Sequence, residues 1–181
     1  ITVWQMAQQE LEPETPAGIP DGFLEAGARL GAQHVLVMSA EPPEARTLER
    51  FCDLCDRARQ YVLHVCLEFA IYAGVRTIED AARIVKQSGR SNASVLVDAL
   101  HFSRSGGVPS HIAGIDASLF RYAQICAAPA DIPMQTSSLI REARTGRLLP
   151  GDGALPLREL VAALPAAIPL SIEAPVRATA G

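Results

Sequence analysis

Short apolar runs recur along the chain at intervals of roughly 30 residues. Runs of four to eight apolar residues between turn signals are typical of strands that are buried on both faces, as in a parallel sheet. The pattern predicts six strands, at 1–7, 34–38, 62–67, 94–98, 120–126 and 169–173.

Amphipathic stretches lie between these runs. Apolar residues at helical spacing predict helices at 21–31, 44–60, 77–89 and 155–164. Thr77 followed three residues later by Asp80 is typical of a helix start, and Gly89 of a helix end. The rest predicts loops at 8–19, 103–118 and 127–153, with a short helix near 110–113 and one helical turn at 138–145.

Strands that alternate with helices favour βα units and a parallel sheet, so the predicted class is α/β. No Gly-x-Gly-x-x-Gly follows the first strand, which argues against a dinucleotide-binding fold. A (β/α)₈ TIM barrel needs about 250 residues and eight strands. Six strands in 181 residues match a barrel that lacks its first strands and, after Glu173, its last helix. Because proteins avoid open strand edges, we expect residues upstream of Ile1 or a partner chain to complete it.

Composition and charge limit the kind of protein and the partners that the sequence allows. Hydrophobic residues make up 49% and charged residues 20%, which is typical of a globular domain with a sizeable core. The net charge of −4 and the lack of a basic stripe argue against a nucleic-acid partner. No apolar run reaches the ~18 residues of a membrane span, and the first residues, which we expect to form a strand, are not typical of a signal peptide. The four cysteines fit reduced, buried thiols rather than a disulfide framework, so we expect a cytoplasmic protein.

Four polar side chains lie at or near the carboxyl ends of four successive predicted strands: Glu68, Asp98, Gln124 and Glu173. In a parallel barrel these ends converge on the face where active sites form. Three carboxylates crowded together repel one another, and a divalent cation removes that repulsion. Oxygen ligands favour Mn²⁺, with Mg²⁺ or Co²⁺ as alternatives, and Zn²⁺ is less favoured because the four include no histidine.

Histidines fall into two groups. His101 follows Asp98 by three residues, and we expect it to contact a substrate oxygen or to move a proton. His34 and His64 lie at strand beginnings, on the barrel face that serves stability, and are expected to be structural.

The run RLLPGDG at 147–153 predicts a tight turn. Arg141, Arg144 and Arg147 lie in or just before it, and one of them could bind a substrate carboxylate or phosphate through its planar fork. Arg147 is the best placed of the three. Arg104, in the loop expected after His101, is a second candidate anion binder.

Five segments carry a resemblance: LEF (67–69), VDALHF (97–102), YAQICAAP (122–129), RLLPGDG (147–153) and SIEAP (171–175). In this order they resemble the sugar phosphate isomerase/epimerase superfamily, the xylose isomerase-like TIM barrels, over about residues 20–175. The resemblance implies one divalent metal held by Glu68, Asp98, Gln124 and Glu173, and a substrate contact at His101. It also implies a single partial barrel domain over 1–181, from about strand 3 to strand 8.

The implied activity is a metal-dependent isomerase or epimerase of a small sugar or sugar phosphate, in which Glu68 and Glu173 remove and return a proton through an enediolate. Gln124, the Ala-Pro after Ala127 and Arg-x-x-Pro-Gly-x-Gly also resemble the 3-dehydroshikimate dehydratases, which are lyases acting on a hydroxy-keto acid. Relatives often carry aspartate where this chain has Ala127. A degenerate, non-catalytic relative is therefore a third hypothesis, and a homo-oligomer is compatible with all three.

Overall fold

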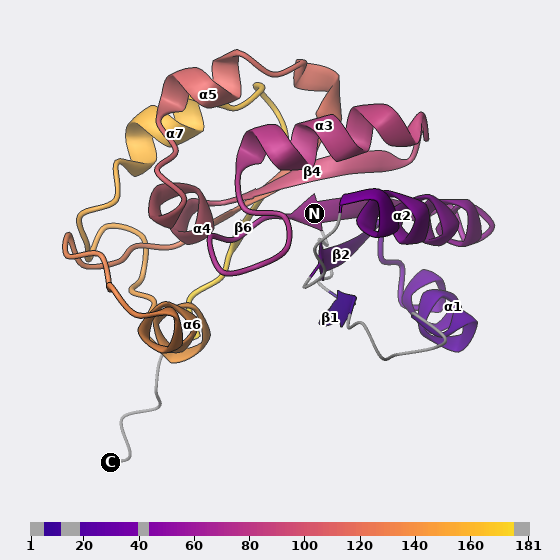
Figure 1. The fold of residues 1–181 in the computed structure, drawn as a ribbon, viewed down its shortest axis with the longest axis horizontal. Helices are drawn as coiled ribbons and strands as arrows, with labels where there is room; N and C mark the ends of the chain where they lie inside the picture. Colours follow the sequence, from indigo (N-terminus) through magenta and orange to yellow (C-terminus); the bar gives the residue numbers. More distant parts are fainter. Residues whose placement is uncertain (1–5, 12–18, 40–43, 176–181) are drawn as a thin grey trace.

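Six parallel strands form one sheet in simple chain order in the computed structural model, which describes residues 6–11, 19–39 and 44–175 (Figure 1). Each strand pairs in parallel with the next. The strands are β1 (Met6–Leu11), β2 (His34–Ser39), β3 (His64–Glu68), β4 (Ala93–Asp98), β5 (Phe120–Ile125) and β6 (Leu170–Ile172). The expected α/β class with a parallel sheet is confirmed.

Helices connect the strands, and most lie around the outside of the sheet (Figure 1). Helices α4 and α6 instead lie toward the carboxyl ends of the strands. None of the helices in the described ranges is long and apolar enough to cross a membrane. The helices are α1 (Asp21–Arg29), α2 (Glu44–Arg59), α3 (Ile78–Ser88), α4 (Ala99–Arg104), α5 (Pro109–Ala113), α6 (Thr136–Thr145) and α7 (Leu157–Ala163), with a 3₁₀ turn η1 (Ala117–Leu119) before β5.

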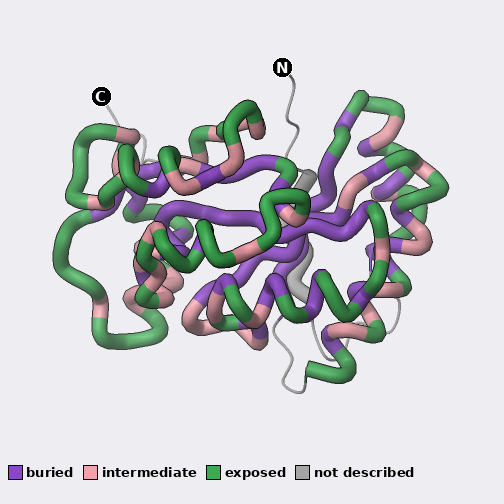
Figure 2. The backbone as a smooth tube through the Cα atoms, turned by 90° about the horizontal axis from the view of Figure 1, so that it is seen from above, coloured by how far each residue is buried: buried purple, intermediate pink, exposed green. Residues whose placement is uncertain are grey.

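Both faces of the central strands are buried, and their backbone runs purple through the middle of Figure 2. Side chains alternate between the faces because successive residues of a strand point in opposite directions. One set, including Val35, Val65 and Val95, joins the large core beneath the helices. The other set forms a separate inner cluster of Leu36, Cys66, Leu96 and Tyr122. This inner cluster is what the interior of a barrel requires, and it lies below the polar ends of the same strands.

Two strand positions differ from the sequence prediction. Residues 1–5 of the strand expected at 1–7 lie outside the described residues, and β1 extends to Leu11 through a segment expected to be a loop. Pairing with β2 needs only backbone groups, so the polar residues of 8–10 do not prevent it. The strand expected from 62 begins at His64, because Val62 is an exposed turn residue with φ +58°.

Two loops expected from composition contain helices. Helix α4 begins directly after β4 and extends into the start of the loop expected at 103–118. His101 and Arg104 therefore lie on a helix. Helix α6 has ten residues, where one turn was expected at 138–145. Glycine and proline at the edges of these segments led to the prediction of loops. Short helices are stabilised mainly by tertiary contacts, which the local sequence does not indicate.

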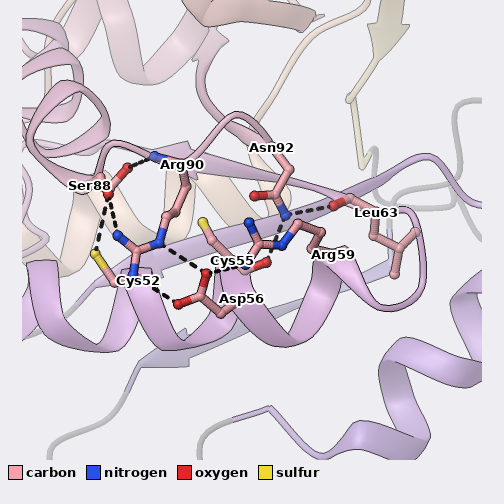
Figure 3. Close-up of polar contacts among 8 residues, drawn as sticks. All are labelled: Cys52, Cys55, Asp56, Arg59, Leu63, Ser88, Arg90 and Asn92. Atoms are coloured by element: carbon pink, nitrogen blue, oxygen red, sulfur yellow. Dashed lines mark hydrogen bonds and ion pairs between the residues drawn. The ribbon is translucent and has the colours of Figure 1, made fainter.

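A polar network fixes the helical layer at the beginning of β4 (Figure 3). Asn92 donates to the carbonyl oxygens of Cys55 and Leu63, at 2.8 and 3.1 Å. Arg90 binds the Asp56 carboxylate of α2 with both arms of its fork, at 3.0 and 2.9 Å. Cys55 is buried in this layer, and burial raises the pKa of its thiol to about 12. The four cysteines are free thiols, and three of them are buried as expected, whereas Cys52 is only partly buried.

Candidate metal centre and substrate cavity

The carboxyl ends of β3, β4 and β5 bring three of the predicted ligands onto one end of the sheet. Glu68 and Asp98 are the last residues of β3 and β4, and Gln124 lies beside Asp98 in the register of β4 and β5. All three side chains are completely buried. Glu173 follows β6 directly, and its backbone N–H donates to the carbonyl oxygen of Ile125 at 3.1 Å.

Glu68, Asp98 and His101 form a group whose potential ligand atoms all lie within 4.8 Å of one another. Ligands bind a divalent ion at about 2.1 Å, so two of them on opposite sides of it are separated by about 4.2 Å. The group therefore fits one divalent ion after a movement of a few tenths of an ångström. The four predicted ligands include no histidine, which was the reason for placing Zn²⁺ behind Mn²⁺. Because His101 adds a ring nitrogen to the group, the group suits Zn²⁺ as well as the other borderline cations.

Asp98 is engaged through both carboxylate oxygens. One oxygen accepts the backbone N–H of His101 at 2.9 Å, which makes Asp98 the N-cap of α4. The other accepts Nη1 of Arg147 at 2.5 Å. Burial alone would raise the pKa of this carboxyl, but the nearby Arg147 guanidinium and the His101 N–H hold that pKa below its usual value.

Arg147 lies at the centre of the site and is almost completely buried. Its Nε donates to the carbonyl oxygen of Ala143 at 2.9 Å, and its Nη2 lies 3.7 Å from Oε2 of Glu173. Burial lowers the pKa of the guanidinium, and the carboxylates of Asp98 and Glu173 outweigh that effect and raise it. The predicted substrate binder thus touches two of the predicted ligands, and it also lines the cavity described below.

His101 is neutral in this setting. Its Nε2 lies 3.4 Å from Nη2 of Arg147, and a guanidinium can only donate, so Nε2 is the acceptor and Nδ1 carries the proton. Burial lowers the pKa of the ring below its usual value, although Asp98 acts in the other direction. The ring of Tyr72 packs edge-on against His101, with centroids 5.7 Å apart. A neutral imidazole at this point can accept or donate one proton.

The turn of 147–153 positions Arg147. Ala127 and Leu148 exchange two backbone hydrogen bonds of 2.8 Å, which attach the turn to the end of β5. A Cβ atom at Gly153 would lie 2.5 Å from the carbonyl oxygen of Ala128 and 2.9 Å from the Cβ of Ala127. The turn therefore needs glycine at 153, and the small buried side chain of Ala127 fits against it.

A cavity of about 340 Å³ opens beside the ligand group. His101 belongs to both the ligand group and the cavity wall. Most of the wall was not predicted from the sequence, although Met38 and Ser39 lie at the end of β2, as the predicted ligands lie at the ends of their strands. The lining residues are Met38, Ser39, Tyr72, Ala73, His101, Ile140, Ala143, Arg144, Arg147, Glu173 and Pro175.

Arg104 does not serve as the predicted anion binder. It lies on α4 rather than in a loop, and both arms of its fork bind the Glu142 carboxylate of α6, at 2.9 and 2.7 Å. It also donates to the carbonyl oxygen of Pro129 at 2.9 Å, and it is absent from the cavity lining. Arg104 therefore joins α4 to α6 and has a structural role.

No protein-family model and no curated protein sequence matches the chain. Among solved structures, the IolI protein with a bound zinc atom superposes with a TM-score of 0.74 at 22% identity, over 87% of this chain and 59% of that one. A xylose isomerase-like TIM barrel/4-hydroxyphenylpyruvate dioxygenase fusion protein gives a TM-score of 0.77 at 22% identity, over 87% and 26%. The fold is that of the xylose isomerase-like TIM barrel.

The likeness extends to a D-psicose 3-epimerase from Clostridium cellulolyticum H10, solved with D-tagatose, with a TM-score of 0.64 at 15% identity, over 85% of this chain and 54% of that one. The chain thus spans just over half of IolI and of this epimerase, so its six strands form part of a xylose isomerase-like barrel. The expected partial barrel is confirmed. Glu68, Asp98, Gln124 and Glu173 lie at the end of this barrel where the carboxyl ends of the strands meet.

Proposed function

We propose that this protein is a divalent-metal-dependent isomerase or epimerase that moves a proton on a small hydroxy-carbonyl compound. The observation that carries the proposal is the position of the ligand group directly beside a cavity of about 340 Å³, with His101 in both. That volume suits a small substrate.

Glu68, Asp98, Gln124 and Glu173 would hold one metal ion, with Mn²⁺ as the first choice, and His101 would join them through Nε2 only after releasing Arg147. When bound, the metal would polarise the substrate carbonyl and acidify the neighbouring C–H bond. Asp98 is suited to metal binding because its pKa lies below the usual value, so the carboxylate is ionised at neutral pH.

The two remaining carboxylates supply the proton transfer in this proposal. One of Glu68 and Glu173 takes a proton from the carbon beside the carbonyl, which leaves an enediolate, and the other returns a proton to the opposite face or the neighbouring carbon. His101 would donate a hydrogen bond from Nδ1 to a substrate oxygen. Arg147 would hold Glu173 beside the cavity through their 3.7 Å contact.

A lyase of the 3-dehydroshikimate dehydratase type is the second candidate. The apolar part of the cavity wall, which includes Met38, Tyr72 and Ile140, favours it, because a carbon ring with few hydroxyl groups suits such a wall better than a sugar does. In that reaction the enolate expels a hydroxyl group, and His101 would protonate this group so that it leaves as water.

Deuterium exchange tests the proposal. The Mn²⁺-loaded protein, incubated in D₂O with a panel of ketoses and aldoses, should incorporate solvent deuterium at the carbon beside the carbonyl of its substrate, as measured by NMR. A parallel assay with 3-dehydroshikimate should instead give an aromatic absorbance if the lyase reaction is correct.

Asp98→Asn and Glu68→Gln should lose Mn²⁺ binding in isothermal titration and lose exchange with it. Arg141→Gln, an exposed change on α6 outside the cavity lining, should leave both unchanged. A folded protein that binds no divalent cation would refute both enzymatic candidates and favour the degenerate, non-catalytic relative.

A further inference from the structure

Two histidines lie side by side at the opposite end of the sheet from the ligand group. His34 and His64 are the first residues of β2 and β3, and they are direct partners in the register of these parallel strands. Their ring centroids are 5.9 Å apart. The ring of Tyr122, a member of the inner cluster, lies 4.9 Å from that of His34. The pair therefore belongs to the interior of the barrel, at the amino ends of the strands.

The protein leaves polar atoms of this pair unsatisfied. His34 is only 6% exposed, and His64 is half-buried. Nδ1 of each ring is buried and has no hydrogen-bond partner among the described residues. A buried polar atom without a partner costs about 1–3 kcal/mol, and a bound water or ion removes that cost. Two such atoms on neighbouring rings indicate a ligand that both rings could bind.

The spacing of the two rings fits one metal ion. A ligating imidazole nitrogen lies about 2.1 Å from the ion and the ring centre about 1.1 Å farther away, so each centroid is about 3.2 Å from the ion. Two rings that bind a tetrahedral ion then have centroids about 5.2 Å apart, and two rings on opposite sides of the ion about 6.4 Å apart. The observed 5.9 Å lies between these limits.

The chemistry of the pair selects the type of ion. Burial lowers the pKa of both rings, and the charge of Arg121 acts in the same direction, so both imidazoles are in the neutral form that binds metal. Imidazole suits Zn²⁺, Ni²⁺ and Cu²⁺, whereas Mn²⁺ and Mg²⁺ prefer oxygen ligands. In the part of the chain that the structure describes, no group of three potential ligands includes the pair, so water would complete the coordination.

We infer that His34 and His64 form a second metal site, which binds one divalent cation of the Zn²⁺, Ni²⁺ or Cu²⁺ type at the amino end of the barrel. His64 and Glu68 lie on the same face of β3, four residues and therefore about 13 Å apart, so this site is separate from the ligand group. An ion held here would join β2 to β3. The second site does not depend on the proposed reaction.

Nickel titration tests the second site. Protein without a histidine tag is titrated with Ni²⁺ by calorimetry, as wild type, His34→Gln, His64→Gln and His111→Gln. His111→Gln is the matched control, because it removes an exposed imidazole that pairs with Glu79 at 3.2 Å, away from the two strands. The wild type and His111→Gln should each bind one more equivalent of Ni²⁺ than His34→Gln and His64→Gln do. Titration with Mn²⁺ should show no such difference.

Electron paramagnetic resonance adds a second measurement. Cu²⁺ at the pair should show coupling to two ring nitrogens, whereas the ligand group can supply only the ring of His101. Because His64 is half-buried, His64→Gln keeps the test decisive if the more deeply buried His34→Gln fails to fold. Equal Ni²⁺ stoichiometry in the wild type and His64→Gln would overturn the inference, as would an equal loss in His111→Gln. A protein that binds Ni²⁺ at the pair but no Mn²⁺ would refute the proposed function and leave the second site unaffected.

Discussion

Replacing Arg147 by methionine should make the stability of the protein strongly dependent on metal. Arg147 and Asp98 form an ion pair of 2.5 Å, in which both side chains are almost completely buried. Removal of one partner from a buried pair costs about 3–5 kcal/mol, because the other charge is left uncompensated. For a protein of this size, that cost corresponds to a fall in Tm of about 6–20 °C in the absence of metal.

A divalent ion bound at Glu68, Asp98 and His101 would give Asp98 a new positive neighbour. Saturation with Mn²⁺ should therefore recover a large part of the loss. By linkage, each 1.4 kcal/mol recovered must appear as tenfold tighter Mn²⁺ binding by Arg147→Met than by the wild type. In this proposal Arg147 supplies the positive charge beside Asp98 when no metal is bound, and it would compete with the metal for Asp98.

Urea unfolding of both proteins, with EDTA and with saturating Mn²⁺, measures the effect. Arg104→Met is the matched control, because it breaks another buried pair, with Glu142, away from the ligand group. Its loss of stability should be the same with and without Mn²⁺. The reasoning is refuted if metal-free Arg147→Met is as stable as the wild type, or if Mn²⁺ leaves the difference between the two unchanged.

Two further predictions concern the support of the site and its pH range. Gly153→Ala should lower the free energy of unfolding by about 1–3 kcal/mol, because its Cβ would lie 2.5 Å from the carbonyl oxygen of Ala128. Thermal denaturation checks this prediction. Gly22→Ala is the control and should not lower the free energy of unfolding, because there is open space around Gly22. An equal effect of the two changes would contradict the close packing at Gly153. Burial, aided by His64 and Arg121, lowers the pKa of His34 to about 4, so between about pH 6.5 and 4 the unfolded chain binds more protons at this residue than the folded protein does. The free energy of unfolding should consequently fall as the pH falls through this window, and His34→Gln should make this fall shallower. Urea unfolding at a series of pH values measures the slope. The same slope in both proteins would show that His34 does not contribute.

The local pattern of apolar and polar residues was sufficient to predict the strands of the sheet and the residues at their carboxyl ends. Buried parallel strands are nearly continuous apolar runs, so the positions of β2 to β5 follow from the sequence to within two residues. A polar residue that ends such a run is conspicuous for the same reason. Glu68, Asp98 and Gln124 were therefore expected at or near strand ends, where they lie, and the expected partial barrel is also confirmed.

Contacts between distant residues could not be predicted in the same way. Arg147 reaches Asp98 across 49 positions and Arg104 reaches Glu142 across 38, and no local spacing indicates either pair. Helix α4 was missed because Asp98 was interpreted only as a ligand, although its carboxylate also accepts the N–H of His101 and so starts the helix. The identity of the substrate depends on the cavity wall, which brings together residues from widely separated loops and from α6.

The double engagement of Asp98 has a consequence for how related sequences should be interpreted. A lineage that abandoned metal chemistry would still lose the start of α4 if it replaced this residue, so selection for folding alone would tend to retain an aspartate here. Glu68 and Gln124 cap no helix among the described residues. If the proposed function is correct, an aspartate at position 98 is therefore weak evidence of activity in a homologue, and the loss of Glu68 or Gln124 beside it would indicate that the metal chemistry has been lost.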